Sequence, residues 1–451
     1  MPVVVDERVA ERLAHDFAGS KRAVRGGALS NGACDDCTAF PAPQRPLSLN
    51  VARGTALSNA TILLFAVAGG IAVANVYYLQ PLLQLIVIDL HASAGSVGFV
   101  SVMMQAGYAI GILAFVPLGD IVQPRPLVTG MFAAVSVMLA LAASAPNVTL
   151  LAVAALAIGT CTTCAQVLLP YGADLADPAR RGRIVGTIQT GLIAGTLCAR
   201  AGGGLIGARF GWRSVFWCAA VLSAGAAVTL WRAMPLRERR ESLSYPALIG
   251  SIVDLIVRHA ALRASMGLGA LAFAAFAAIW TVLAFHLHEL GYGSAVVGGI
   301  GALSIASVVA ARYGGALADR RGTLFTGTVA WLVLAVACVL FATAGWTLAG
   351  IVVAAVVFPL GMSLTQISNQ IRIFALDDAA RGRLNTAYMV TIFAGGTLGA
   401  LGATVTWQHA GWNGTCILLL VLVAAMAPLL WWYRGGEKSA SAAELSRPGD
   451  F

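Results

Sequence analysis

The sequence predicts an all-α membrane protein of about twelve transmembrane helices, arranged as two homologous six-helix halves. Composition, the spacing of apolar segments and an internal repeat each support this fold class. Of 451 residues, 59% are hydrophobic and 11% are charged. A soluble domain carries about 25% charged residues, so the low charge and the mean hydropathy of +0.81 favour a membrane protein.

Apolar segments recur from residue 58 onward with short polar gaps between them. A helix needs roughly 20 apolar residues to cross the hydrocarbon core of a bilayer. By this criterion the predicted spans are residues 60–86, 96–118, 126–144, 148–170, 184–207, 213–233, 264–287, 295–317, 323–343, 347–374, 384–406 and 413–433.

Basic residues are concentrated in alternate gaps between the predicted spans, as at Arg125, Arg181, Arg320 and Arg381. Cytoplasmic loops of membrane proteins carry an excess of Lys and Arg. We therefore expect a multi-pass protein of the cell (inner) membrane with both termini in the cytoplasm.

An internal repeat relates the two halves. The segment DPARRGR at residues 177–183 is followed 200 positions later by DDAARGR at residues 377–383, and Gln366 follows Gln166 at the same offset. The repeat and the polar stretch near its middle divide the chain into parts. These are a flexible cytoplasmic tail (1–57), a six-helix bundle (58–233), a cytoplasmic linker (234–262), a second six-helix bundle (263–434) and a cytoplasmic C-terminal tail (435–451).

A short motif carries the first resemblance to a known family. Residues 315–322 read Gly-Ala-Leu-Ala-Asp-Arg-Arg-Gly, and the corresponding gap of the first half keeps Asp120 and Arg125 without the adjacent Arg. This pattern resembles the G-x-x-x-D-R-x-G loop of the major facilitator superfamily, which implies two bundles that rock to give alternating access. The residues expected to act in gating are Asp120, Arg125, Arg181, Arg183, Gly315, Asp319, Arg320, Gly322, Arg381 and Arg383.

The fifth predicted span resembles a motif of the drug/proton antiporters, G-x8-G-x3-G-P-x2-G-G. The chain has Gly186, Gly195 and the pair at 203–204, but Ala199-Arg200 replaces Gly-Pro. Residues 75–82, Asn-Val-Tyr-Tyr-Leu-Gln-Pro-Leu, are similar to the arabinose-efflux-like branch. These resemblances imply secondary active export of a small organic compound or drug by proton antiport.

Polar side chains inside spans are costly in lipid and therefore face a cavity or a partner helix. Pro81 is expected to loosen the first helix beside such residues. The alternative is that amides only hold neighbouring helices together. The candidate substrate-binding residues are Asn75, Tyr77, Tyr78, Gln80, Gln105, Tyr108, Gln166, Gln189, Arg200, Trp280, Gln366, Asn369, Gln370 and Tyr388.

Arg200 is the one of these that carries a charge, and its repeat partner is Ala400. We expect it to anchor a substrate or anion, although its stem alternatively packs in the bundle while its head reaches the interface. The scarcity of buried charge favours a neutral or lipophilic substrate. An organic anion becomes the better choice if Arg200 faces the cavity.

No carboxylate is expected at mid-span, whereas His286 and His288 lie near the outer end of the seventh span and can titrate near neutrality. Within transport, the alternative is uptake or exchange of a sugar or metabolite; outside it, a non-transporting receptor. The spans contain no H-E-x-x-H or G-x-S-x-G motif. We therefore expect no enzymatic activity, no cofactor, no metal and no nucleic-acid partner, and a monomer in the bilayer that binds a small-molecule substrate and protons.

Overall fold

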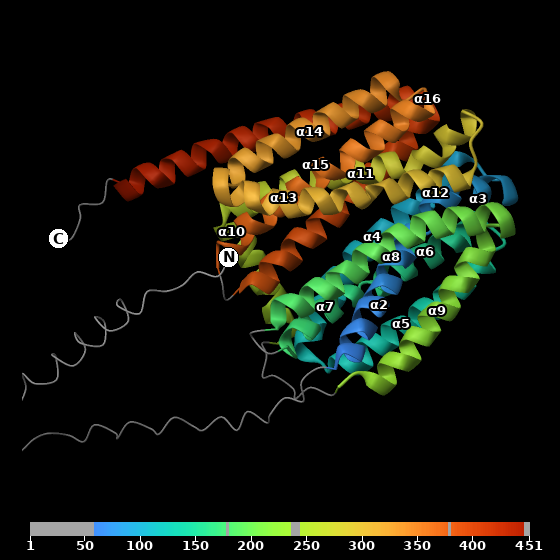
Figure 1. Ribbon diagram of the computed structural model, residues 1–451, viewed down its shortest axis with the longest axis horizontal. Coiled ribbons are helices and arrows are strands. Elements are labelled where there is room, and N and C mark those ends of the chain that lie inside the picture. Colours follow the sequence, from blue (N-terminus) through green and yellow to red (C-terminus); the bar gives the residue numbers. More distant parts are fainter. Residues whose placement is uncertain (1–57, 177–179, 236–243, 378–379, 446–451) are drawn as a thin grey trace, which may run out of the picture. The chain divides into compact units, whose positions relative to one another are not determined.

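A computed structural model describes residues 58–176, 180–235, 244–377 and 380–445, which lie within one unit, Gly54–Phe451. Within these ranges every regular element is a helix and there is no strand. The predicted N-terminal tail, residues 1–57, lies outside the described residues. Figure 1 shows the helices of the N-terminal half (blue to green) beside those of the C-terminal half (yellow to red).

The N-terminal half contains six spans, of which the first and the fourth are interrupted. Its elements are α2 (Asn59–Tyr77), the 3-10 turn η1 (Gln80–Leu82), α3 (Leu83–Asp89), α4 (Ala94–Ile121), α5 (Pro124–Ala143), α6 (Val148–Thr162), α7 (Cys164–Asp174), α8 (Arg181–Phe210) and α9 (Trp212–Ala233). The interruption at η1 contains Pro81, where the sequence predicts a loosened helix. Ser58, Ser93 and Asn147 begin spans as N-caps, each accepting a hydrogen bond from a backbone N–H.

The C-terminal half repeats this arrangement after the linker. Its elements are α11 (Ala260–Glu289), α12 (Ser294–Ala302), the 3-10 turn η2 (Leu303–Ile305), α13 (Ala306–Arg321), α14 (Thr323–Ala344), α15 (Leu348–Phe374) and α16 (Arg381–Leu445). Helix α16 contains a sharp bend at Gly411, where φ is 54°, so it forms both the eleventh and the twelfth span. Only glycine adopts this left-handed conformation at low cost.

Ten helices in the described residues are long and apolar enough to cross a membrane. One of them, 381–432, is divided by the bend at Gly411, and the eighth span is completed by the shorter α12, η2 and α13. The described chain therefore forms twelve spans, as the sequence predicts.

The linker contains a helix that the sequence pattern did not predict, α10 (Tyr245–Arg258). It buries Leu248, Ile252 and Leu255 on one face and contacts α4, α11 and α16. The linker is therefore packed against both halves rather than being only a polar connection.

Within each half, glycine allows helix backbones to touch. A Cβ on Gly195 of α8 would lie 2.1 Å from the carbonyl oxygen of Gly70 on α2, and one on Gly399 of α16 would lie 2.1 Å from that of Ala274 on α11. Such close approach is typical of helix packing in lipid, where small residues replace the hydrophobic driving force.

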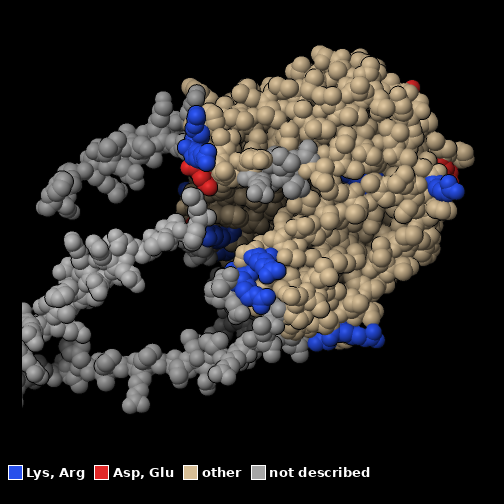
Figure 2. Space-filling view, in the orientation of Figure 1, with Lys and Arg blue, Asp and Glu red and all other residues tan. Residues whose placement is uncertain are grey.

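Charged side chains lie at the two ends of the spans and leave an uncharged belt between them, as Figure 2 shows. We call the end that carries Arg125, Arg181, Arg320 and Arg381 the basic end. The other end, with the loop after α3, is the opposite end. Apolar side chains such as Leu205, 62% exposed, cover the belt and suit contact with lipid.

Candidate functional site

A cavity of about 270 Å³ lies between the two halves near the middle of the spans. Polar side chains from both halves line it together with apolar ones, and none of the described residues that line it is acidic. The predicted residues in its wall are Tyr77, Tyr108, Gln166, Gln189, Arg200, Gln366 and Tyr388.

Arg200 of α8 is buried at the wall of this cavity, with 1% of its surface exposed. Its Nε donates a hydrogen bond to Oε1 of Gln80 at 2.9 Å, and its Nη1 donates to Oγ of Ser304 at 3.1 Å. Its Nη2 is buried and has no hydrogen-bond partner among the described residues. The two acceptors come from opposite halves, so Arg200 joins them.

Aromatic rings surround the same guanidinium. Its Cζ lies 4.1 Å from the ring centre of Trp280, 4.7 Å from that of Tyr77 and 5.3 Å from that of Phe276. The negative faces of aromatic rings attract cations, and most strongly where water is excluded. These rings partly compensate the buried charge but supply no anion.

Phenylalanine side chains form the apolar part of the cavity. Phe393 of α16 lies 4.2 Å from Tyr108 and 4.8 Å from Phe273, measured between ring centres. Phe273 stacks on Phe276 at 5.3 Å. The body of a bound molecule would therefore contact aromatic surface.

Neutral polar groups lie in the rest of the wall. Nε2 of Gln166 donates to Oη of Tyr108 at 3.2 Å, and Nδ2 of Asn369 donates to Oη of Tyr388 at 3.3 Å. Both hydroxyls keep a proton that can be donated to a ligand.

A second cavity, of about 290 Å³, continues from the first towards the basic end. Gln166 and Met389 line both cavities, and the second reaches Asp174 and Gly382 at the basic end. The central cavity therefore connects towards the basic end in this conformation.

At the opposite end the two halves meet in close contact. A Cβ on Gly298 of α12 would lie 2.4 Å from the carbonyl oxygen of Arg200 and 3.0 Å from Cα of Gly204. Oγ of Ser294 also donates to the carbonyl oxygen of Gly204 at 3.2 Å. We call this contact between α8 and α12 the glycine seam. Helices α4 and α16, also from different halves, meet at the same end, where a Cβ on Gly98 would lie 2.8 Å from Oγ1 of Thr404, and the two contacts together close it.

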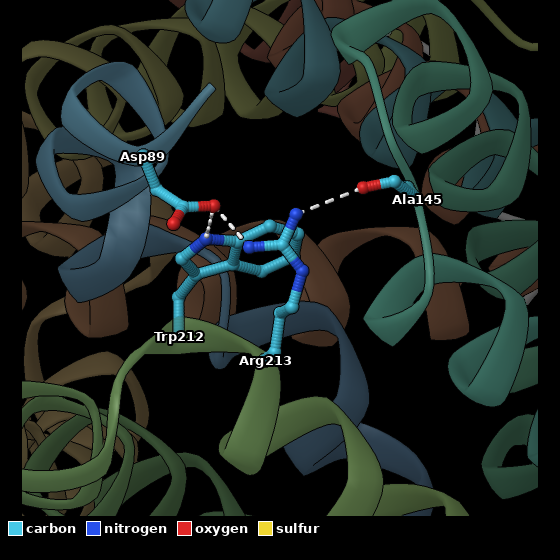
Figure 3. Close-up of polar contacts among 4 residues, drawn as sticks. All are labelled: Asp89, Ala145, Trp212 and Arg213. Carbon is cyan, nitrogen blue, oxygen red and sulfur yellow. Dashed lines mark hydrogen bonds and ion pairs between the residues drawn. The ribbon is translucent and has the colours of Figure 1, made fainter. Parts of the chain in front are cut away.

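The opposite end of the N-terminal half is held by one carboxylate. Asp89, at the end of α3, accepts hydrogen bonds from Nε1 of Trp212 and from Nη1 of Arg213, whose Nη2 donates to the carbonyl oxygen of Ala145. Figure 3 shows these three contacts joining separate elements. The hydrogen bond from Arg213 lowers the pKa of Asp89 below its ordinary value.

His286 is buried near the same end in α11, away from the cavity wall. Its ring stacks on Trp412 at 3.8 Å, its Nε2 lies 2.8 Å from the carbonyl oxygen of Gly345, and its Nδ1 makes no hydrogen bond. That Nδ1 lies 3.8 Å from a carboxylate oxygen of Glu289. His286 therefore lies within the seventh span but is not among the residues that line the central cavity.

The predicted gating residues lie at the basic end. Gly322 ends α13 with φ 83°, a conformation that favours glycine, while Asp319 and Arg320 are exposed. Asp319 makes no ion pair with any residue in the described ranges. The side chain of Asp120 lies outside the described residues.

Arginines at the same end contact the ends of neighbouring helices. Nε of Arg181 donates to the carbonyl oxygen of Ala173 at 3.0 Å, and Arg125 lies over the ring of Trp231 at 5.0 Å. The remaining predicted gating residues are Arg183, which is exposed, Arg383 and Gly315, both partly buried, and Arg381, whose Nε donates to the carbonyl oxygen of Phe374 at 3.3 Å.

Several predicted binding residues do not line the cavity. Asn75 is turned towards α9, where its Nδ2 donates to Oγ of Ser223 at 3.2 Å. Trp280 contacts Arg200 behind the cavity wall, and Asn369 acts through Tyr388. The others outside the wall are Tyr78, Gln80, Gln105 and Gln370, of which Gln80 holds Arg200.

Two polar residues near the cavity were missed from the sequence. Ser304 lines the cavity and holds Arg200. Arg372 of α15 is buried, and its Nη1 donates to Oδ1 of Asn369 at 3.3 Å and to Oγ of Ser265 at 3.5 Å. The signal for Arg372 was its position three residues after Asn369, which places both on one helix face.

The family is decided by comparison with known proteins. The chain matches the profile described as "Major Facilitator Superfamily" over residues 65–400. The chain belongs to this superfamily. It is a membrane transporter rather than an enzyme, because its curated relatives are named as transporters.

One such relative is "Uncharacterized transporter YgaY" of Escherichia coli O157:H7, 36% identical over 388 residues, which are 86% of this chain and 98% of that protein. Another is "Probable transporter SCO4007" of Streptomyces coelicolor, 33% identical over 84% of this chain and 88% of that protein. Neither printed name gives a substrate.

Solved structures of the superfamily share the fold. A mutant of the nucleoside transporter NupG superposes with a TM-score of 0.67 at 14% identity, over 83% of this chain and 99% of that one. A bacterial homologue of the lysosomal transporter Spinster, described as inward-facing and occupied, gives 0.67 at 13% identity, over 84% and 96% of the chains. At such identities the likeness shows the fold alone.

Proposed function

We propose that this transporter exports a small organic compound across the cell (inner) membrane in exchange for protons, by alternating access of the central cavity. The basic end faces the cytoplasm in this proposal, because cytoplasmic loops carry the excess of Lys and Arg. Both described chain ends, residues 58 and 445, then lie on the cytoplasmic side.

The observation that carries the proposal is the arrangement of the two cavities and the glycine seam. The central cavity is lined by both halves, continues towards the basic end through Gln166 and Met389, and is closed at the opposite end where Gly298 meets Arg200. An exporter would load its substrate from the cytoplasm through such an opening, and an importer would release it there. The outward direction in our proposal rests on the resemblance of the fifth span to the drug/proton antiporters. Rocking of the halves would then open the seam and close the basic end.

Exchange with protons is supported by the resemblance of the fifth span to the drug/proton antiporters. The described part of the cavity wall has no carboxylate to carry the proton. We assign this role to His286, since an imidazole can gain and lose a proton in proteins, this one is buried within a span, and a carboxylate oxygen of Glu289 lies 3.8 Å from its Nδ1.

Inverted membrane vesicles from cells that overproduce the protein test the proposal. Respiration acidifies their lumen, a fluorescent dye follows the lumen pH, and organic anions, lipophilic cations, neutral antibiotics and sugars are added in turn. An exported substrate should release the proton gradient in these vesicles but not in vesicles without the protein. If no compound does so while the protein is correctly inserted, proton-coupled export of those classes is wrong, and uptake or exchange of a metabolite takes its place.

A further inference from the structure

We propose that the central cavity binds a small organic acid with a single carboxylate, whose oxygens accept hydrogen bonds from Arg200 while its apolar body lies against the phenylalanines. This inference rests on the proposed function, because it names the substrate class of the same cavity. It is argued from the surroundings of one guanidinium.

The charge of Arg200 has no anionic partner in the described chain. Its acceptors, Gln80 and Ser304, are neutral, and its Nη2 is buried without any acceptor. A buried charge without a counter-ion is costly, and arginine binds planar carboxylates through paired hydrogen bonds. A carboxylate ligand would supply both the missing charge and the missing acceptor.

The position of Arg200 is built by both halves at breaks in their helices. Gln80 lies in η1 of the first span and Ser304 in η2 of the eighth. Transporters commonly place substrate sites where helices are interrupted near the bilayer midplane. Gly301 completes the space, since a Cβ there would lie 2.6 Å from Cδ of Arg200. The guanidinium therefore has a fixed place that leaves one edge unsatisfied.

The remainder of the wall selects the body and the charge of the ligand. Phe273, Phe276 and Phe393 offer apolar contact, while Gln189 and Gln366 offer neutral hydrogen bonds. The volume of about 270 Å³ lies just below the usual range for ligand pockets, about 300–1,000 Å³. Among the described residues of the wall, Arg200 is the one basic residue and none is acidic. A second negative charge would have no partner, and a cationic ligand would be repelled.

Binding to the purified full-length protein tests this inference without requiring transport. Tryptophan fluorescence is suited to the measurement, because Trp280 lies 4.1 Å from Arg200. The probes are benzoate, its neutral isostere benzamide, the cation benzylammonium and the dianion phthalate, all in chloride-free buffer. Benzoate should bind at least about tenfold more tightly than each of the other three. Benzamide lacks the negative charge, benzylammonium carries the opposite charge, and the second carboxylate of phthalate would have no partner in the described wall.

Variants of Arg200 test whether this side chain binds the carboxylate. Arg200→Gln should lower benzoate affinity by about tenfold or more and leave weak benzamide binding unchanged. Arg200→Lys should lose less, because it keeps the charge but not the paired donors. Arg209→Gln is the matched control, as Arg209 lies on the same helix but is exposed. If Arg200→Gln does not fold, Arg200→Lys and the ligand series still decide the question.

Equal binding of benzoate and benzamide, stronger binding of benzylammonium, no binding of any probe, or unchanged benzoate binding in both Arg200 variants would overturn the inference. The vesicle experiment tests the proposed function independently of this binding experiment. Proton release by compounds other than anions would keep the proposed function and reject the organic acid. Arg200-dependent binding of benzoate without proton release would keep the organic acid and reject proton-coupled export.

Discussion

A single methyl group at Gly298 should shift the balance between the two conformations of this transporter. In the conformation described here, a Cβ at this position would lie 2.4 Å from the carbonyl oxygen of Arg200. Carbon and oxygen atoms normally approach to about 3.3 Å. The glycine seam must therefore separate by roughly 1 Å to admit alanine.

The cost of this overpacking is about 1–3 kcal/mol when the surroundings cannot move. Because α8 and α12 belong to different halves, the strain is relieved by opening the seam rather than by distorting one bundle. At about 1.4 kcal/mol for each factor of ten, the ratio of seam-closed to seam-open molecules should fall by roughly 5- to 150-fold in Gly298→Ala.

Distances between spin labels measure this shift directly. Ser144 and Thr343 are both exposed. Ser144 follows α5 in the N-terminal half and Thr343 is near the end of α14 in the C-terminal half, so both lie at the opposite end of the molecule from the basic end. Cysteines at these two positions, in a background without the native cysteines, report the separation of the halves by pulsed electron paramagnetic resonance. Gly298→Ala should increase the population of long distances.

The neighbouring glycine supplies the control. A Cβ on Gly299 would meet no atom within 4 Å. Gly299→Ala should therefore leave the distance distribution unchanged, although both variants replace glycine by alanine on one helix. An unaltered distribution in Gly298→Ala, with correctly folded protein, would show that the seam does not limit opening.

Three further predictions concern residues outside the cavity. Asp89→Asn should lower thermal stability at pH 7. Because the pKa of Asp89 is lowered in the folded protein, this difference should begin to shrink as the pH falls below about 4, the ordinary pKa of aspartate, and vanish once the pH is below the lowered pKa of the folded protein. A difference that does not shrink below about pH 4 would reject the role of the Arg213 contact. Asn75→Ala should cost roughly 1 kcal/mol of stability without changing benzoate affinity. The double variant Asn75→Ala, Ser223→Ala should lose less stability than the sum of the losses in the two single variants. Additive losses, or weaker benzoate binding, would contradict a purely structural hydrogen bond. His286→Gln should abolish substrate-driven proton release in vesicles while benzoate binding is kept, and undiminished release would remove His286 from the coupling mechanism.

The spans could be predicted from the sequence because hydropathy and length determine them almost alone. The break in the first span could also be predicted, since Pro81 cannot donate a backbone hydrogen bond. The break at η2 in the eighth span has no proline to mark it. Its position depends on packing between the halves, where Ser304 meets Arg200. Such contacts have no periodic signature in the sequence.

The cavity wall could be predicted only in part for a related reason. Helical periodicity states which residues share a face, but not which neighbour that face meets. Asn75 and Tyr77 both lie within the first span, yet Asn75 bonds to Ser223 inside its own half and Tyr77 lines the cavity. The rotation of each helix is set by backbone contacts such as Gly70 against Gly195, which only the folded chain shows.

The surroundings of Arg200 differ from those of its counterpart in the other half of the duplicated chain. At the same 200-residue offset, Arg200 corresponds to Ala400, which packs in a small apolar cluster with Val102 and Ala277. Ala277 is in turn the counterpart of Tyr77, one of the rings around the guanidinium. That cluster lies outside the described cavity wall, in which Arg200 forms a charged pole and Phe273 and Phe393 form an apolar one. A ligand with one carboxylate and an apolar body fits such a surface in a single orientation. Because the charged pole draws its ligands from both halves, opening of the glycine seam must change how that carboxylate is held.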